Sequence, residues 1–436
     1  MNLAQLKGMF VARGCTRLYA KPLAANDNSK NQVYFGPGFN ALNLFPNTGI
    51  FADSSPKNPI FKARLQFAWM LADGRVTEAP NAQLILYPQY PEVRFSGFLL
   101  GCKSAPSDLM AGRMEGRILF LGVTSTRGVV GFVVSAASEI AGEYRTLGHH
   151  LTDGVFAELA LPSIPSGEDS RGLLLAALHR IHGKGWIDSK QLDSHRQLKP
   201  CNAPQCGGFT LEAELNIPKN SDAEPDFLGW EVKQYAVEDF DRIESAKAIT
   251  LMTPEPTGGY YKEHNAEAFV RKFGYVDKMG RSDRMNFGGR HFFGRRCPPT
   301  GLTMQLNGYD AGTGKITDPA GAIALVSDKG EVAAEWDFGK ILEHWSHKHT
   351  KAVYVPSKCR TDPQRQYSYG NKVRLAQKTD SLRLLAAFAN GGVYYYPGIK
   401  LENVTIGEPK TKKRSQFRVA SRDITALYET VETVEV

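Results

Sequence analysis

Two acidic residues and a lysine lie close together in the segment PDFLGWEVKQ, residues 225–234. Asp226, Glu231 and Lys233 have the spacing D-x4-E-x-K. Because side chains alternate between the two faces of a strand, Glu231 and Lys233 are expected to point to the same side. Two converging carboxylates can bind Mg²⁺, and a nearby lysine can orient or deprotonate water or neutralise charge on a phosphate. Hydrolysis of a phosphodiester requires these groups.

The residues around this motif bear on whether it forms a site. An ordinary surface strand with solvated acids and a lysine has the same spacing. Here Trp230 and Val232 alternate with the charged residues, which predicts one buried and one polar face. Upstream, GGFTLEAEL at 207–215 predicts a helix with Thr210 as a possible N-cap. This helix could bring Glu212, a third carboxylate, towards the same metal site.

The run GGFTLEAELNIPKNSDAEPDFLGWEVKQ at 207–234 resembles the MvaI/BcnI family of restriction endonucleases, part of the PD-(D/E)xK nuclease superfamily. Mismatch nickases of the MutH type are similar, including the glutamate on the preceding helix. By position, the resemblance implies that Asp226 and Glu231 are metal ligands, Lys233 the catalytic lysine and Glu212 an accessory catalytic carboxylate. It implies Mg²⁺ as the cofactor and an α/β fold with a mixed sheet flanked by helices for residues 169–436.

Residues 1–160 have a different sequence pattern from the rest of the chain. Short β-like runs separated by Gly, Pro and Asn predict a compact barrel or sandwich over 1–160. A segment punctuated by Pro, Ser and Gly predicts a linker at 161–168, followed by a helix that begins at Asp169 or Ser170. The predicted strands are 32–35, 82–87, 94–100, 117–123 and 129–135, and the last two form a hairpin of buried strands.

The run RLYAKPLAANDNSKNQVYFGPGF at 17–39 resembles the N-terminal effector domain of EcoRII-type restriction enzymes, a DNA-binding pseudobarrel that grips the major groove with two loops. Asn and Gln can pair with adenine and Asp can accept from cytosine, although the same residues are typical of ordinary polar turns. The resemblance implies a first loop of Asn26, Asp27, Asn28, Lys30, Asn31 and Gln32. It implies a second loop with Lys103, Arg113 and Arg117, which is shorter and less basic than in EcoRII-type domains.

Two further segments could contact DNA. The segment 281–296 holds five arginines, one acid and a Gly-Gly pair, which favours a DNA-clamping loop over a solvated basic loop. Its candidates for phosphate or guanine contacts are Arg281, Arg284, Arg290 and Arg295. In MvaI-like enzymes such regions read bases, which implies that His347, Lys348 and His349 are readers and that Asp310 faces cytosine. The His347–His349 pair could alternatively bind zinc, but no third ligand is identified.

Composition allows this interpretation and narrows the class of protein. The 436 residues carry 53 Lys+Arg against 45 Asp+Glu, a net charge of +8 that suits a polyanionic partner. There is no apolar run of membrane-spanning length and no signal peptide. Because none of the six cysteines forms a C-x-x-C pair, free thiols in a reducing cytoplasm are favoured over a zinc site. The cysteines are Cys15, Cys102, Cys201, Cys206, Cys297 and Cys359.

Together the two resemblances imply a sequence-specific double-stranded DNA endonuclease of the UbaLAI type, which joins an EcoRII-like domain to an MvaI-like one. They imply a type IIE restriction enzyme with the target CCWGG, which acts as a monomer, binds up to two target copies and has a cognate DNA methyltransferase in its host. Two alternatives stay open. One is a MutH-like nicking or repair endonuclease, and the other is a sequence-specific DNA-binding regulator that does not cleave.

Overall fold

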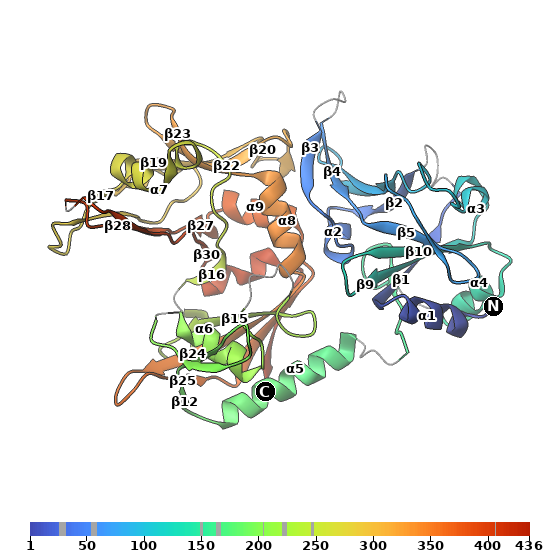
Figure 1. The fold of residues 1–436 in the computed structure, drawn as a ribbon, viewed down its shortest axis with the longest axis horizontal. Coiled ribbons are helices and arrows are strands. Elements are labelled where there is room, and N and C mark those ends of the chain that lie inside the picture. The colour runs from blue at the N-terminus through green and yellow to red at the C-terminus, as the bar shows by residue number, and fades with distance from the viewer. Residues whose placement is uncertain are drawn as a thin grey trace. The chain divides into compact units, whose positions relative to one another are not determined.

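The computed structural model describes residues 1–25, 32–53, 59–148, 151–162, 167–203, 205–219, 225–245, 248–405 and 407–436 (Figure 1). The chain divides into two compact units, Met1–Arg171 and Gly172–Val436, hereafter the N-terminal and C-terminal units. The division falls shortly after the predicted linker at 161–168, of which residues 163–166 lie outside the described part.

The N-terminal unit contains two sheets. In the first, the order is β11-β1-β9-β10-β5-β6, and β10 and β5 are its one parallel pair. Its strands are β1 (Cys15–Leu23), β5 (Phe67–Met70), β6 (Val76–Glu78), β9 (Arg117–Thr124), β10 (Val129–Val134) and β11 (Ala157–Glu158). The second sheet is antiparallel, in the order β2-β8-β7-β4-β3. Its strands are β2 (Gln32–Pro37), β3 (Ile50–Asp53), β4 (Ile60–Arg64), β7 (Gln83–Tyr87) and β8 (Glu92–Ser96). The β-rich character expected from the sequence is confirmed.

Helices cover the N-terminal sheets: α1 (Leu3–Ala12), α2 (Ala41–Leu44), α3 (Ser107–Ala111) and α4 (Glu139–Thr146). The sequence analysis did not predict α1, which begins with a capping box between Asn2 and Gln5. Phe10 of α1 packs against Gly122 in β9, where an added Cβ would lie 2.5 Å from its ring. Close approach of helix and sheet therefore requires glycine inside an otherwise apolar strand. The predicted hairpin of β9 and β10 is confirmed by six antiparallel residue pairs.

The main sheet of the C-terminal unit is mixed, as expected. Its order is β12-β25-β24-β26-β31, and β15 pairs with β24 in parallel while the other pairs are antiparallel. Helices α5 and α6 share one core with this sheet, with Leu178 and Leu211 packed near Val232 and Val353. The elements are α5 (Gly167–Gly183), β12 (Ile187–Asp188), α6 (Cys206–Glu214), β15 (Glu231–Ala236), β24 (Lys351–Arg360), β25 (Gln366–Tyr369), β26 (Lys372–Gln377) and β31 (Thr430–Glu435).

Smaller antiparallel sheets complete the unit, in the orders β13-β14, β16-β30-β27, β17-β18-β28-β29, β19-β22-β23 and β20-β21. Among the described residues, no helix has the length and apolar character needed to cross a bilayer. The strands are β13 (Lys190–Leu192), β14 (Leu198–Pro200), β16 (Ile249–Met252), β17 (Tyr275–Val276), β18 (Arg284–Gly288), β19 (Leu302–Asn307), β20 (Tyr309–Asp310), β21 (Lys315–Ile316), β22 (Ala322–Ser327), β23 (Val332–Asp337), β27 (Val393–Tyr395), β28 (Gly398–Glu402), β29 (Lys410–Lys412) and β30 (Phe417–Val419). The remaining helices are α7 (Tyr260–Phe273), α8 (Phe338–Lys348), α9 (Ser381–Ala389) and the 3₁₀ turns Ile243–Ser245 and Ser421–Leu427.

The starts of two helices differ from the prediction. Helix α5 begins at Gly167, ahead of the predicted caps Asp169 and Ser170. Helix α6 begins at Cys206, so Thr210 lies inside it and is not its N-cap. The hydroxyl of Thr210 instead accepts from the backbone N–H of Lys190 and donates to its carbonyl, each at 3.1 Å. The Thr210 side chain therefore bonds to a residue 20 positions earlier in the chain, a contact that the local sequence does not show.

The cysteines also differ from the prediction. Cys201 and Cys206 form a disulfide immediately before and at the start of α6, so the expectation of six free thiols is wrong for this pair. The other four cysteines are free. The predicted cytoplasmic location, which rested partly on free thiols, stays a prediction.

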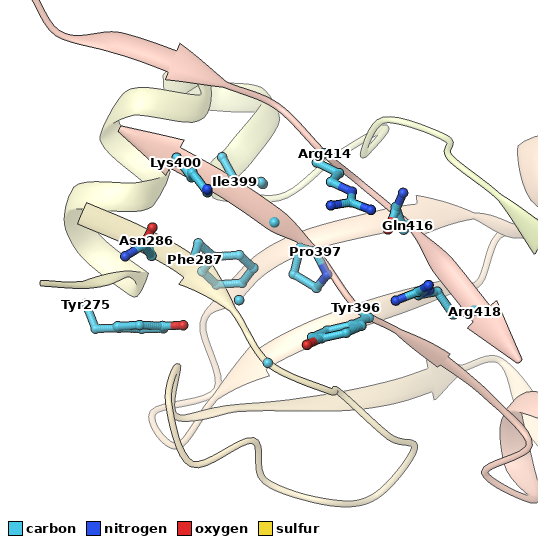
Figure 2. Close-up of a pocket in the computed structure, with 13 residues that line it drawn as sticks. Tyr275, Asn286, Phe287, Tyr396, Pro397, Ile399, Lys400, Arg414, Gln416 and Arg418 are labelled. Atoms are coloured by element: carbon cyan, nitrogen blue, oxygen red, sulfur yellow. The ribbon is translucent and has the colours of Figure 1, made fainter. Parts of the chain in front are cut away.

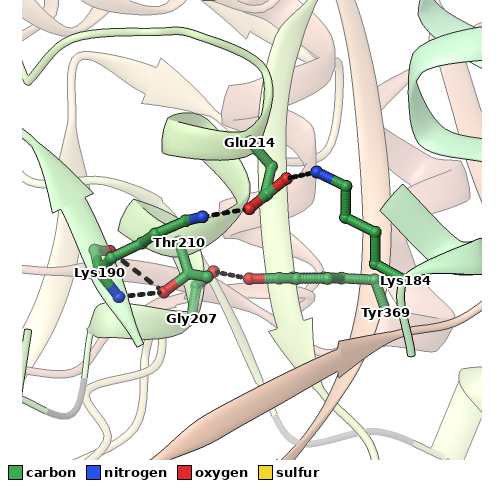
Figure 3. Close-up of polar contacts among 6 residues, drawn as sticks. All are labelled: Lys184, Lys190, Gly207, Thr210, Glu214 and Tyr369. Atoms are coloured by element: carbon green, nitrogen blue, oxygen red, sulfur yellow. Dashed lines mark hydrogen bonds and ion pairs between the residues drawn. The ribbon is translucent and has the colours of Figure 1, made fainter. Parts of the chain in front are cut away.

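Polar contacts fix α6 to the rest of the unit (Figure 3). Glu214 is nearly buried and pairs with Lys184 at 2.6 Å and Lys190 at 2.5 Å. The hydroxyl of Tyr369 on β25 donates to the carbonyl of Gly207 at 2.8 Å. These contacts, with those of Thr210, tie both ends of the helix to its neighbours and so fix the direction of its remaining side chains, Glu212 among them.

We predict that Glu214→Gln destabilises the protein by about 1–3 kcal/mol at neutral pH, because it weakens two charge-assisted contacts at a buried position. Burial alone would raise the pKa of Glu214, but its hydrogen bonds with Lys184 and Lys190 outweigh this effect and lower the pKa. Its stabilisation is therefore present above the unfolded-state pKa of about 4.3 and is lost as pH falls through the folded-state value.

Calorimetric unfolding from pH 7 to pH 3 tests this prediction, with Glu408→Gln as a control at an exposed position. The stability difference between wild type and Glu214→Gln should shrink in acid. A difference that is absent at pH 7, or that keeps its size at pH 3, would show that these ion pairs do not stabilise the fold.

Candidate active site

A tight turn places Asp226 beside the start of β15. Phe227 and Trp230 exchange backbone hydrogen bonds of 2.9 and 2.8 Å across Leu228 and Gly229, whose φ angles are 47° and 86°. Two positive φ angles give the tightest form of hairpin turn, and glycine adopts this conformation without strain. The chain reverses, and Asp226 Oδ2 accepts the backbone N–H of Val232 at 2.9 Å.

Glu231 and Lys233 lie on one face of β15, as the strand period predicts. Lys233 Nζ donates to Glu231 Oε1 at 2.5 Å, and the side chains are 20% and 3% exposed, respectively. The second oxygen of Glu231, Oε2, is buried and has no hydrogen-bond partner among the described residues. A buried carboxylate oxygen without a donor is costly in the protein alone and is suited to ligate a cation.

The electrostatics bring Glu212 into the same group of carboxylates. Burial and then the charge of Glu231 raise the pKa of Asp226 to about 6. Burial and then the charge of Asp226 raise the pKa of Glu212 to about 7. Burial alone would lower the pKa of Lys233, but the charge of Glu231 and its hydrogen bond outweigh burial and raise it. The three carboxylates therefore repel one another, and Lys233 carries a positive charge between them.

Helix α8 contributes two more groups to this environment. The pKa values of Glu212 and Asp226 are raised overall by burial, but the charge of Lys348 acts in the opposite direction on both. Its ammonium group is therefore within electrostatic reach of the two carboxylates. His344, one turn earlier on α8, has its pKa lowered by burial and then by the charges of Lys348 and Lys233. The sequence analysis did not single out His344, although its i, i+4 spacing from Lys348 places both on one helix face.

The donor set suits a hard divalent cation. Within the described part of the chain, no three His, Cys, Asp or Glu side chains are already arranged as a metal site. Asp226 and Glu231 nevertheless both offer carboxylate oxygens at the start of β15. The Oε2 of Glu231, which has no partner among the described residues, fits a ligand role. The zinc alternative at His347 and His349 lacks a third ligand among the described residues. The ring of His349 is buried and stacks on Trp345 at a centroid distance of 4.1 Å, although its two nitrogens have no hydrogen-bond partner there.

The burial of His349 also contradicts its predicted role as a base reader, since a fully buried ring does not reach a base edge. His347 and Lys348 are partly exposed at the end of α8. Asp310 uses its carboxylate in its own turn, where Oδ2 accepts the hydroxyl of Thr313 at 2.8 Å and Oδ1 accepts the N–H of Gly312 at 2.8 Å. The turn residues compete with any base for Asp310.

The arginines of 281–296 separate into two groups. Arg284 lies on β18, where it forms a nearly buried ion pair with Asp277 and is only 13% exposed. This pairing contradicts a direct phosphate contact by Arg284, and the strand contradicts the prediction of one continuous loop. Arg281, Arg290 and Arg295 are exposed.

In the N-terminal unit, Asn26, Asp27, Asn28, Lys30 and Asn31 lie outside the described residues. Gln32 opens β2, opposite Ser96, and Lys103 and Arg113 are exposed. Arg117 is 1% exposed, and its guanidinium donates to the carbonyls of Met114, Leu109 and Ala24. Its burial contradicts the predicted DNA contact, because Arg117 instead satisfies backbone carbonyls.

Comparisons with known proteins show what this chain is similar to. The comparison with curated proteins finds no match. Two solved structures are similar: "Restriction endonuclease MvaI-cognate DNA substrate complex", with 15% identity, a TM-score of 0.45 and coverage of 60% of this chain and 97% of that chain, and "Restriction endonuclease MvaI in the absence of DNA", with 14% identity, a TM-score of 0.33 and coverage of 62% and 99%. The model of the MvaI/BcnI restriction endonuclease family matches residues 175–428, which span more than half of the chain and include α6, β15 and α8. The chain therefore belongs to the MvaI/BcnI restriction endonuclease family.

Proposed function

We propose that this protein is a type II restriction endonuclease that hydrolyses double-stranded DNA at a specific sequence, with Mg²⁺ as its cofactor. The observation that carries the proposal is the convergence of Asp226, Glu231 and Lys233, in which a buried oxygen of Glu231 has no protein donor. Membership of a restriction endonuclease family supports the same reaction class.

Asp226 and Glu231 would hold the metal. When bound, Mg²⁺ supplies a Lewis acid for the phosphate and lowers the pKa of a coordinated water. The backbone N–H of Val232 fixes the Asp226 carboxylate, and the ion pair with Lys233 fixes Glu231. The positive charge of Lys233 would stabilise negative charge that develops on the phosphate in the transition state. Glu212 would act as an accessory ligand or proton acceptor, because its raised pKa of about 7 lets it exchange a proton near neutrality.

Binding of DNA would be divided between the two units. In the C-terminal unit, the exposed Arg281, Arg290 and Arg295 would contact phosphates, and His347 and Lys348 would lie near the bases. In the N-terminal unit, the exposed Lys103 and Arg113 and the segment 26–32 would read a second copy of the target, as the resemblance to EcoRII-type effector domains implies. The proposal extends to a monomeric type IIE enzyme with the target CCWGG and to a cognate methyltransferase in its host.

Incubation of the purified protein with plasmid DNA and Mg²⁺, followed by sequencing of the ends, tests the reaction. Double-strand breaks at one sequence are expected. Breaks confined to one strand would instead favour a MutH-like nicking enzyme. Specific binding without any cleavage would favour a regulator.

We predict that Asp226→Ala or Lys233→Ala reduces the cleavage rate by about 100-fold or more, because each removes charge stabilisation in the transition state. Replacement of Glu212 should reduce it less, since water can substitute for an accessory ligand. Single-turnover cleavage and binding of an oligonucleotide duplex would be measured for each variant. Asp241→Ala is the control, since its side chain is 82% exposed. Near wild-type rates for either first variant would refute the assignment.

We predict that, in the presence of a chelator, Asp226→Asn is more stable than the wild type at neutral pH. The folded-state pKa of Asp226 is about 6. This value is raised above the unfolded value of about 3.9, so the stabilisation from its protonated form is present below pH 4 and is lost as pH rises through 6. Asn at this position does not ionise, so the variant avoids this loss of folding free energy, which amounts to about 1–3 kcal/mol at pH 7.

Thermal unfolding from pH 4 to pH 8 measures this difference, with Asp241→Asn as the control. Addition of Mg²⁺ should raise the melting temperature of the wild type and leave that of Asp226→Asn and Glu231→Gln nearly unchanged, since a ligand stabilises only a state that binds it. An equal response of all three proteins would place the metal elsewhere.

We predict that the two units separate the two DNA-binding activities. A fragment of residues 1–166 ends just before α5 and keeps its own core, which includes Leu18, Phe120 and Leu161. It should bind duplex that contains the target in preference to random duplex, without cleavage, while residues 167–436 should still cleave. Competition gel-shift and cleavage assays of both fragments measure this. Absence of any preference by a folded N-terminal fragment would exclude the effector role.

A further inference from the structure

A cavity of about 360 Å³ opens between β18, β28 and the segment that leads into β30 (Figure 2). It belongs to the C-terminal unit, but β18 and β28 are in a different sheet from β15, and the cavity shares no lining residue with the carboxylate site. Its polar lining side chains are those of Tyr275, Asn286, Tyr396, Lys400, Arg414, Gln416 and Arg418. The catalytic assignment leaves this cavity without a role.

Two glycines that face each other on neighbouring strands line part of the cavity with backbone atoms. Gly288 of β18 lies directly opposite Gly398 of β28 in the antiparallel register. A Cβ at Gly288 would lie 3.3 Å from the hydroxyl of Tyr275, and one at Gly398 would lie 3.2 Å from Cδ of Arg414. Both distances are tighter than ordinary van der Waals contact. Glycine within strands often marks a place where another group approaches the backbone closely, and here it keeps space for the tyrosine and the arginine.

The arginine-bearing wall is held in place by backbone pairing. The N–H groups of Tyr396 and Gly398 donate to the carbonyls of Gln416 and Arg414, each at 2.8 Å. Residues 414–418 therefore run alongside residues 394–398 as an extended chain, in which alternate side chains share one face. As Figure 2 shows, Arg414, Gln416 and Arg418 follow one another along the cavity.

Positive charge in this wall lacks a compensating acid. Arg414 and Arg418 of this wall, and Arg290, which does not line the cavity, form no ion pair with an acidic residue in the part of the chain that the structure describes. The guanidinium groups of Arg290 and Arg418 lie 5.9 and 5.5 Å from the ring of Tyr396. Arg418 donates to the carbonyl of Ala248 at 2.6 Å, but its Nε is buried without an acceptor.

The charges on these arginines also affect one another. Burial lowers the pKa of Arg418, and the charges of Arg414 and Arg290 lower it further. An anion in the cavity would offset this repulsion. Guanidinium groups suit phosphate oxygens because their donors form a planar fork, and phenol and amide groups can donate to the remaining oxygens.

We propose that this cavity is a phosphate-binding site, in which Arg414 and Arg418 hold the anion and Tyr275, Tyr396 and Gln416 supply further hydrogen bonds. If the protein binds DNA, as proposed above, the anion is a backbone phosphate other than the one that is hydrolysed, because the two sites are built on different sheets. A free phosphate or nucleotide has the same chemistry and is the second source.

The first experiment measures phosphate binding by the full-length protein without DNA. Isothermal titration with inorganic phosphate and with thymidine 5′-monophosphate would compare the wild type, Arg414→Gln and Arg418→Lys. Arg422→Gln is the matched control, since Arg422 is 80% exposed and does not line the cavity. Arg414 is also exposed, so its replacement is expected to leave the fold intact. Arg414→Gln should weaken binding by about tenfold, as expected for loss of one charge-assisted contact.

The second experiment measures binding of a duplex with a chelator present, as a function of salt concentration. Loss of one phosphate contact should reduce the slope of log K against log salt by about 0.9 in Arg414→Gln but not in Arg422→Gln. Changes in both experiments would support a DNA phosphate as the ligand. A change in titration alone would support a free phosphate-bearing ligand.

No effect of Arg414→Gln or Arg418→Lys in either experiment would overturn the phosphate site. The proposed endonuclease function fails separately, if the wild type neither binds nor cleaves DNA. In that event the titration with phosphate still reports on the cavity.

Discussion

Mutual repulsion of buried carboxylates is the constraint on which the structure around β15 depends. Asp226 and Glu231 are brought together by a two-residue turn, and Glu212 approaches them from α6. Carboxylates at such positions favour protonation, which the raised pKa values of Asp226 and Glu212 show. The positive charges of Lys233 and Lys348 partly offset their charge. A site of this kind is poorly compensated without a cation, and this is the physical basis for metal binding.

The surrounding elements supply the rigidity that such a site requires. Helix α6 is held by the ion pairs of Glu214 and by the bonds of Thr210 and Tyr369, so Glu212 projects from a fixed backbone. Strand β15 pairs in parallel with β24, which itself also pairs with β25 and β26 of the mixed sheet. Repulsion between like charges is tolerated because packing and hydrogen bonds elsewhere stabilise the fold.

Basic residues have two distinct uses in this protein. Arg117 and Arg284 are buried, the first against backbone carbonyls and the second against Asp277, so both stabilise their units. Arg290 and Arg418 lie over the ring of Tyr396, and these two residues and Arg414 have no acidic ion-pair partner among the described residues. The net charge of +8 does not distinguish these uses, because the sequence counts charges and the fold decides which of them remain available to a ligand.

Features that depend on neighbouring residues could be predicted from the sequence. The alternation of Trp230, Glu231, Val232 and Lys233 predicts a strand with a polar face, and the buried runs at 117–134 predict a hairpin, because both patterns follow from the two-residue period of a strand. Features that depend on residues distant in the chain could not be predicted, because they arise only in the folded structure. The hydroxyl of Thr210 bonds to the backbone of Lys190 instead of capping a helix. His349 is buried against Trp345, and the cavity at Gly288 and Gly398 forms where two strands distant in the chain pair in register. No local pattern encodes those pairings, since they arise only when the sheets and helices pack.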